Sequence, residues 1–339
     1  MVQESTRVVE EIDVSGMTRD EWLALRRRHL TSTDAAPLIG DREIYPYDST
    51  PLSLYLQKQE EIPEPDLSQN RFVVWGLLLE PVVAQQFAAR HPEYDVVKGT
   101  NFYSRTDVGF PMGSSIDYLL RHKETGEVGI LEIKTAGRDE AKNPYMAWGP
   151  SGSDMIPAMY KIQVHQQEAC FPTPLKAVYV AALIGGNDYR EYQVPIDPSL
   201  QAGIMQIERA FWTKHIVPGV MPDPQSFSDA LAFVGGFKDE VIQLTHEQSL
   251  SIIGLAEVRA KKSALEKEEE RLKRDVVLTL GGAKKAVGPD GRHLCSISES
   301  TQNRVSAERV RAVLGDRTPE VTEPVTITQV RPAKGLIAE

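Results

Sequence analysis

The sequence is poor in cysteine. Its 339 residues include only two, Cys170 and Cys295, and they lie far apart in the chain. Two distant cysteines suit a reducing compartment and argue against an iron–sulfur cluster or a zinc finger. We therefore expect a cytoplasmic protein without a disulfide framework.

Long apolar runs are also missing. No stretch of the sequence reads as long enough to cross a bilayer, and Met1–Ser5 lacks the basic-then-apolar pattern of a signal peptide. We expect no membrane partner. The hydrophobic content of 41% and the charged content of 25% are those of an ordinary globular protein with room for a substantial core.

The sequence also lacks an excess of positive charge. Lysine and arginine number 38 against 48 acidic residues, which gives a net charge of −10. Proteins that bind nucleic acid usually carry a basic footprint, so this total argues against broad, non-specific coating of DNA. A narrow basic track remains compatible with it, because net charge is a sum over the whole chain.

The most informative segment lies near the middle of the chain. Asp117 is followed fifteen residues later by Glu132, and Lys134 stands two positions further on. The flanks, residues 116–120 and 128–134, read as two strands of a hairpin around a polar turn. Alternation along the second strand directs Glu132 and Lys134 to one face and the apolar Leu131 and Ile133 to the other.

Two carboxylates and a lysine on one sheet surface suit metal-dependent hydrolysis of a phosphodiester. Mg²⁺ takes hard oxygen ligands, often one or two carboxylates, and polarises the phosphoryl group. We expect Asp117, Glu132 and the backbone carbonyl of Ile133 to bind Mg²⁺, which Mn²⁺ could replace. Lys134 would orient or help to deprotonate the attacking water and offset charge.

A plain structural interpretation competes with this one. A Glu-x-Lys pair on a strand is commonly a solvated charge pair. The strand around it, however, is mostly apolar, and charges on a core-like strand are costly unless they are paired or bound to metal. That cost favours the catalytic interpretation.

The chain divides into three predicted parts. Residues 1–17 read as a flexible lead, residues 18–225 as a mixed α/β domain, and residues 226–339 as an extension. Thr18 and Glu21 form the pattern of a helix capping box, and a second helix is predicted to start within 30–36. The extension is predicted to hold a charged helix or helical hairpin over 248–275 and a small β-rich region over 285–335.

Several motifs, taken together and in order, resemble a known family. The chain is similar to the YqaJ-type viral recombinases, related to phage lambda exonuclease, in the PD-(D/E)XK nuclease superfamily. Asp117, Glu132 and Lys134 match the family's catalytic residues. Other matching segments are the opening stretch 22–34, the helix of Trp75–Glu80, the helix segment 160–164, and the β-hairpin of 177–192.

The resemblance assigns roles to single residues. Arg26, together with Thr33 in place of the family's serine, would bind a 5′-phosphate, while Glu80 would lie near the metal. Among the residues themselves, Thr31 could donate its hydroxyl to a phosphate or serve only in capping. Gln163 could bind DNA or the active-site lysine, or lie on an exposed helix face, and Tyr160 could contact substrate or merely pack.

The resemblance implies a restriction-endonuclease-like core and a Mg²⁺-dependent double-stranded DNA exonuclease. Such an enzyme would digest one strand from 5′ to 3′, leave a 3′ overhang, and serve a single-strand annealing protein in phage-type recombination. A trimeric ring around DNA is implied too. If a phage encodes the chain, it would act in the cytoplasm of the bacterial host.

Two alternatives stay open at this stage. One is a restriction-like or structure-specific endonuclease on the same fold, and the other is a non-catalytic scaffold that binds DNA ends. Cleavage of a closed circle would favour the first. The presence of Asp117, Glu132 and Lys134 argues against the second, and the variant Asp117→Ala should abolish cleavage while DNA binding persists.

Overall fold

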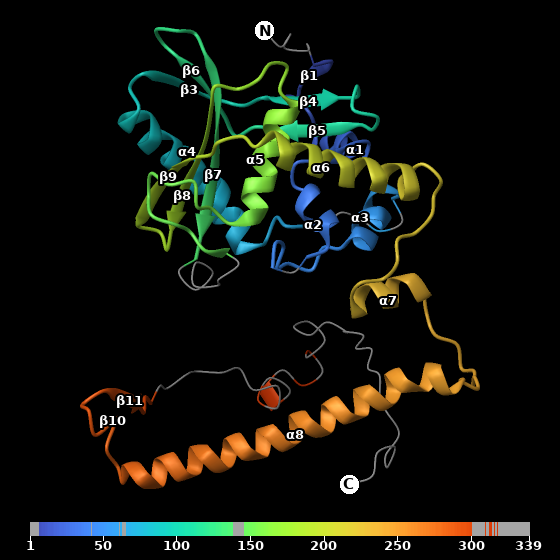
Figure 1. The fold of residues 1–339 in the computed structure, drawn as a ribbon, viewed down its shortest axis with the longest axis vertical. Coiled ribbons are helices and arrows are strands. Elements are labelled where there is room, and N and C mark those ends of the chain that lie inside the picture. Colours follow the sequence, from blue (N-terminus) through green and yellow to red (C-terminus); the bar gives the residue numbers. More distant parts are fainter. Residues whose placement is uncertain are drawn as a thin grey trace. The chain divides into compact units, whose positions relative to one another are not determined.

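The computed structural model describes residues 7–299 except 42, 61, 63–65 and 138–145, and beyond them only 309, 312, 313, 315 and 317. The chain forms two compact units, residues 1–237 and 238–339 (Figure 1). The first unit contains two β-sheets, of five and four strands. The predicted fold class, mixed sheets flanked by helices, is confirmed for this unit.

The five-stranded sheet has the order β3-β6-β7-β8-β9. Its strands are β3 (Tyr94–Lys98), β6 (Tyr118–His122), β7 (Val128–Ala136), β8 (Ala177–Ile184) and β9 (Asp188–Gln193). β6 and β7 form the predicted antiparallel hairpin, and β7 pairs with β8 in parallel. β7, which carries Glu132 and Lys134, is the third of the five strands in this order and therefore the central one. Because β7 and β8 are parallel, the chain between them must cross over from one end of the sheet to the other.

Helices cover both faces of this sheet. On one face, α4 (Arg71–Arg90) packs through Val83, Ala84 and Phe87 against Leu131 and Ile133. The predicted inward direction of these two strand residues is thereby confirmed. The opposite face, with Ile130, Val178 and Val180, belongs to the main core that also contains residues of α5 (Ala158–Cys170) (Figure 1).

α4 is unusually apolar for a helix that is half exposed. Pro81 lies inside it, and the helix continues across this residue. Within the described part of the chain, α4 is the one helix long and apolar enough to cross a membrane, judged by length and composition alone. A single helix that passes this test carries little weight, because helices of soluble proteins pass it too. The sequence was expected to contain no segment long and apolar enough to cross a bilayer, and α4 corrects that expectation.

The four-stranded sheet has the order β1-β4-β5-β2. It contains β1 (Val9–Asp13), β4 (Asn101–Arg105), β5 (Met112–Ser115) and β2 (Leu30–Thr31). The prediction of a flexible lead was wrong in part, because residues 9–13 form strand β1, which pairs with β4. The predicted helix start within 30–36 is confirmed at Ala35, where α2 (Ala35–Ile39) begins. Leu30–Thr31, just before it, forms a strand parallel to β5.

Four further helices and a π-helical turn belong to the part of the sequence before residue 227. α1 (Arg19–Arg27) starts at the predicted capping box of Thr18 and Glu21. α2 spans Ala35–Ile39 and α3 spans Pro51–Lys58. α6 (Pro198–Phe211) continues into the π-helical turn Trp212–Ile216.

The first unit extends further than the predicted boundary at residue 225. Helix α7 (Phe227–Val234) belongs to it. Asp229, on α7, is buried and accepts a hydrogen bond of 2.7 Å from the Thr50 hydroxyl at the start of α3. This long-range bond ties α7 to the domain, and the sequence contains no local sign of it.

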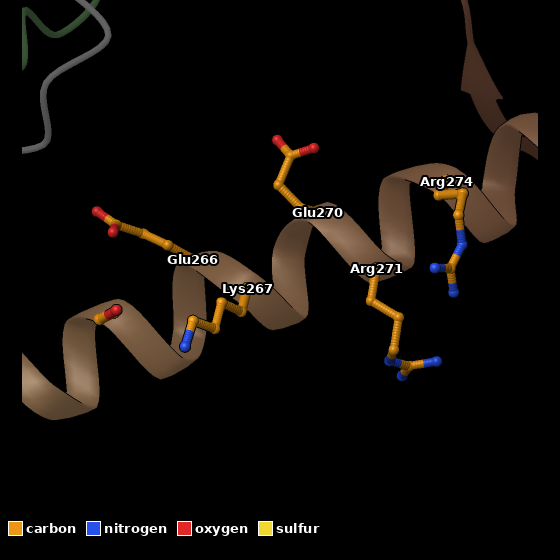
Figure 2. A pocket seen from close by; sticks show the side chains of 6 residues that line it. Glu266, Lys267, Glu270, Arg271 and Arg274 are labelled. Carbon is orange, nitrogen blue, oxygen red and sulfur yellow. The ribbon is translucent and has the colours of Figure 1, made fainter.

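The second unit contains one long helix, α8 (His246–Leu280), and a hairpin of β10 (Lys285–Val287) and β11 (His293–Ser296). The predicted charged helix over 248–275 is confirmed as part of α8, and the alternative of a helical hairpin is excluded. A hollow of about 560 Å³ is lined by Glu266, Lys267, Glu270 and neighbours, all on α8 (Figure 2). It is a space between side chains of one helix and encloses no site. Most of the remaining β-rich region lies outside the described residues.

Candidate active site

Asp117 and Glu132 meet at the sheet edge where β5 passes into β6. Tyr118 pairs with Leu131, so one step along the same antiparallel register sets Asp117 opposite Glu132. Asp117 Oδ2 accepts a hydrogen bond of 2.9 Å from the backbone N–H of Ile133. Burial, the charge of Glu132 and, less, that of Glu80 raise the pKa of Asp117 to about 7.

Lys134 lies against Glu132, as the sequence predicted for residues two apart on one strand. Its Nζ is 2.6 Å from Glu132 Oε1. Burial lowers the pKa of Lys134, but Glu132 and Asp117 outweigh that effect and raise it above its ordinary value. Lys134 is therefore a fixed cation in this state, which favours the roles of orienting groups and offsetting charge over that of a proton acceptor.

Helix α5 presents two glutamines to the buried carboxylate of Glu132. Gln163 Nε2 donates to Oε1 and Gln167 Nε2 donates to Oε2, each over 2.6 Å. Their spacing of four places both on one side of the helix. Gln163 thus contacts the acid rather than Lys134. Tyr160 lies one turn earlier, with the Lys134 Nζ 4.8 Å from its ring centroid.

Glu80 reaches the same region from α4. Its carboxylate pairs with Lys98 Nζ, which comes from the end of β3 and also lies 5.0 Å from the ring centroid of Tyr118. Burial lowers the pKa of Lys98, but the contacts with Glu80 and, less strongly, the charge of Asp117 raise it above its ordinary value. Lys98 thus joins Glu80 to the carboxylate pair.

The predicted phosphate-binding residues cluster between α1 and α2, with Arg26 on α1, Thr31 on β2 and Thr33 just after β2. Arg26 Nη2 donates a hydrogen bond of 2.9 Å to Thr33 Oγ1. Thr33 Oγ1 lies 3.1 Å from Thr31 Oγ1. The guanidinium of Arg26 also lies 4.8 Å from the ring centroid of Trp22. Thr33 is exposed and Thr31 is buried, so the two hydroxyls differ in their access to a ligand.

One cavity of about 530 Å³ brings these groups together. Arg26 and Thr33 line it on one side, and it reaches Asp117, Glu132 and Lys134. Gln163, Gln167, Glu80 and the exposed Phe72 and Leu77 of α4 line it as well. Thr31 and Tyr160 are not among the residues that line it, and they support Thr33 and Lys134 from behind.

The donor set fits a hard divalent cation. Asp117 and Glu132 are two neighbouring carboxylates, and burial, followed by the charge of Glu132, raises the pKa of Asp117. Within the described part of the chain, no three His, Cys, Asp or Glu side chains form a metal-binding group. Two carboxylates are the kind of hard oxygen ligand that Mg²⁺ takes beside several waters, whereas Zn²⁺ sites are usually built from Cys and His.

Sequence reasoning left three groups of this region without a role. Gln167 could have been found, because it follows Gln163 by four residues on the same helix. Lys58 and Lys98 come from α3 and β3, far from any motif, and only the fold brings them to the site. No local pattern indicates either lysine.

Residues 21–173 match the family model of the YqaJ-like viral recombinase domain. This match covers a little less than half of the chain, and it is what that part of the chain is similar to. A curated relative, the uncharacterized protein YqaJ of Bacillus subtilis (strain 168), is 25% identical over 329 residues, which are 92% of each chain. All the site residues named above lie inside the matched domain.

Three solved structures show a more distant likeness. LHK-Exo in complex with dAMP is 18% identical, with a TM-score of 0.42 over 57% of this chain and 91% of that one. A SOX–DNA complex is 14% identical, with a TM-score of 0.38 over 64% and 72%. A KSHV SOX–RNA complex is 12% identical, with a TM-score of 0.36 over 65% and 75%.

Proposed function

We propose that this protein is a Mg²⁺-dependent exonuclease of double-stranded DNA that starts at a phosphorylated 5′ end. One observation carries the proposal: Arg26 and Thr33 line the same cavity as Asp117, Glu132 and Lys134. A guanidinium and a hydroxyl suit a terminal phosphate, while the carboxylates and lysine suit the neighbouring phosphodiester. A cavity that binds a terminal phosphate beside the reacting bond favours cleavage from an end.

The chemistry divides among named groups. Asp117 and Glu132, with the carbonyl of Ile133, would hold Mg²⁺, which polarises a phosphoryl group and lowers the pKa of water. Gln163 and Gln167 fix both oxygens of Glu132. Lys134, as a fixed cation, would offset the charge that develops on the phosphate.

The exposed half of α4 supports the choice of a nucleic-acid substrate. Phe72, Trp75, Leu77 and Leu78 are each 59–66% exposed, and Phe72 and Leu77 line the cavity. Aromatic and apolar side chains beside a phosphate-binding site suit contact with nucleobases, since every base has a face that can stack. This surface suits DNA whose end has to be held open.

The remaining parts of the proposal follow the family resemblance. Digestion would run 5′ to 3′, the 3′ overhang would pass to a single-strand annealing protein, and the host cytoplasm would be the place of action. A homo-oligomeric ring would reconcile the net charge of −10 with DNA binding, because only the lining of its bore needs to be basic.

The test uses linear duplex DNA labelled at the 5′ or the 3′ end, with and without a 5′-phosphate, and a closed circle. With Mg²⁺, early loss of the 5′ label from phosphorylated DNA, with the circle intact, is the expected result. Cutting of the circle would favour an endonuclease. Absence of cleavage with either Mg²⁺ or Mn²⁺ would favour a scaffold that binds DNA ends.

The matched control is Asp117→Ala. It removes one proposed metal ligand and should abolish cleavage while the chain still shifts the mobility of linear DNA. If the variant cleaves at the wild-type rate, the catalytic assignment is wrong, whatever the substrate.

A further inference from the structure

Lys58 lies beneath the phosphate-binding cluster and does not reach the cavity. Its side chain is 3% exposed. Its Nζ donates to the carbonyl oxygens of Arg26 (3.0 Å) and His29 (2.7 Å) and to Asp34 Oδ2 (2.8 Å). An ammonium group has three protons to donate, so these three acceptors use all of them. Lys58 is thus committed to the protein.

Asp34 continues the connection toward the ligand side. Its Oδ2 accepts hydrogen bonds from the backbone N–H of Thr31 (2.8 Å) and from the Thr31 hydroxyl (2.9 Å). Because that hydroxyl has given its proton to Asp34, the hydroxyl of Thr33 donates in the 3.1 Å contact with Thr31. Thr33 in turn accepts from the guanidinium of Arg26.

The hydrogen bonds therefore form a closed ring. It runs from the carbonyl of Arg26 through Lys58, Asp34, Thr31 and Thr33 back to the guanidinium of Arg26. A closed ring fixes the position of each member through two neighbours, and it leaves Arg26 and Thr33 as the members that line the cavity. Lys58 and Asp34 stand behind them.

Charge gives the ring a second consequence. A buried carboxylate beside a phosphate site would repel the ligand and attract Arg26. Burial raises the pKa of Asp34, but the cations of Lys58 and Arg26 outweigh it, and the pKa is lowered. Asp34 is thus ionised, and Lys58 is the cation in direct contact with it.

We propose that Lys58 and Asp34 are positioning residues whose charges cancel behind the site, so that the charge of Arg26 remains available for the 5′-phosphate. The inference rests on the phosphate site of the proposed function. Loss of Lys58 would leave Asp34 to draw Arg26 inward, away from the ligand. Loss of both charges together would leave Arg26 free again.

The experiment compares initial rates on 5′-phosphorylated and 5′-hydroxyl duplex ends for four chains. They are the wild type, Lys58→Met, the double variant Lys58→Met/Asp34→Asn, and the control Lys123→Met. Lys123 also pairs with a carbonyl and an aspartate, at Pro92 (2.6 Å) and Asp95 (3.8 Å), but it lies on the outer turn of the β6–β7 hairpin. Thermal unfolding is measured for each.

We expect Lys58→Met to lower the preference for the phosphorylated end about tenfold, through KM, a change that corresponds to one lost charge contact. The rate on the hydroxyl end should change much less. The double variant should recover a preference within about threefold of the wild type, as expected when an uncompensated buried charge is removed. The control should keep the wild-type ratio.

The negative outcomes are separable. The positioning role is wrong if Lys58→Met keeps the preference for the phosphorylated end or loses activity equally on both ends. It is also wrong if the double variant does not recover the preference. In each of these cases the phosphate site itself still stands. If the wild type shows no preference, the phosphate site itself fails and the inference falls with it. If Lys58→Met does not fold, Lys58→Gln takes its place, because it keeps hydrogen-bond donors without the charge.

Discussion

Gln167 donates a hydrogen bond of 2.6 Å to Glu132 Oε2, and its amide nitrogen also lies 3.1 Å from the carbonyl oxygen of Ser115. One buried amide therefore joins the central strand β7 to the end of β5, from which the chain continues to Asp117. Hydrogen bonds to a charged group contribute about 1.5–3 kcal/mol each, more than those between neutral groups. Gln167 is thus expected to fix the direction of the Glu132 carboxylate.

Replacement of Gln167 by leucine should lower kcat about tenfold or more, since 1.4 kcal/mol corresponds to a factor of ten in rate. The measurement is single-turnover cleavage of a labelled duplex at saturating DNA. Gln206→Leu, on the exposed side of α6, is the control of the same chemical change. Equal rates for Gln167→Leu and the wild type would show that Gln163 alone is enough to orient Glu132.

Metal removal gives the second prediction. Chelation with EDTA should stop cleavage, and added Mg²⁺ or Mn²⁺ should restore it. Because burial and the charge of Glu132 raise the pKa of Asp117 to about 7, protons compete with the cation for this ligand near neutral pH. The Mg²⁺ concentration needed for half-maximal activity should therefore rise as the pH is lowered from 8 to 6.

A Mg²⁺ requirement that stays constant over this range would contradict the assignment of Asp117 as a ligand. Titrations at fixed ionic strength separate this effect from the general screening of DNA contacts. Full activity in EDTA would exclude metal-dependent hydrolysis altogether.

Glu208 supplies a prediction about stability. It is fully buried on α6, and neither carboxyl oxygen has a hydrogen-bond partner among the described residues. Gln166 Oε1, on the neighbouring α5, also lacks a partner in that part of the chain. Burial raises the pKa of Glu208 well above 4.5 and the charge of Asp34 adds to this, while Gln166 and Lys58 act more weakly in the opposite sense. A protonated Glu208 could donate to Gln166, which would explain both groups.

The sign of the pH effect follows. Above about pH 4.5 the unfolded chain releases this proton while the folded chain keeps it, so the free energy of unfolding falls by about 1.4 kcal/mol per pH unit until the folded pKa is reached. Glu208→Gln should remove that loss. Its melting temperature should exceed that of the wild type more at pH 8 than at pH 5.

Thermal unfolding at both pH values checks this, with Glu124→Gln in the exposed β6–β7 turn as the control. If the difference in melting temperature between the wild type and Glu208→Gln does not change with pH, Glu208 is ionised in the folded state.

Two glycines provide a contrasting pair. A Cβ on Gly99 would lie 2.0 Å from the carbonyl oxygen of Ile116, next to Asp117. Gly99→Ala must therefore shift the backbone that carries Asp117, and it should reduce both stability and activity. At Gly203, inside α6, such a Cβ would meet nothing within 4 Å apart from its chain neighbours and the backbone of its own helix. Gly203→Ala should stabilise the chain by about 0.5–1 kcal/mol without changing activity.

Urea denaturation and cleavage assays of both variants make the comparison. A Gly99→Ala variant with wild-type activity would mean that the β3–β4 connection can move without displacing Asp117.

Local pattern was enough to predict the central hairpin. The alternation of Leu131, Glu132, Ile133 and Lys134 specified both faces of β7, and the capping box at Thr18 specified the start of α1. These features depend on residues only a few positions apart. The sequence therefore carried them in full.

Features that depend on distant partners could not be predicted. The helix predicted to start within 30–36 does start there, at Ala35, but the strand that Leu30–Thr31 forms before it depends on parallel pairing with Met112–Gly113. Likewise, β1 is a strand because β4 lies beside it. Lys58 has no motif around it and acquires its partners only through the packing of α3 on the α1–β2 turn. The backbone at these positions follows tertiary contacts rather than local preference.

The crossover between β7 and β8 has a consequence for protein synthesis. A growing chain that has emerged as far as Ala136 already contains Asp117, Glu132 and Lys134, yet α5 and the parallel partner strand β8 still lie ahead of it on the messenger. Neither Gln163 nor Gln167 is then available to hold Glu132. The carboxylate of Glu132 therefore gains the two amides that hold it only after α5 has been synthesised.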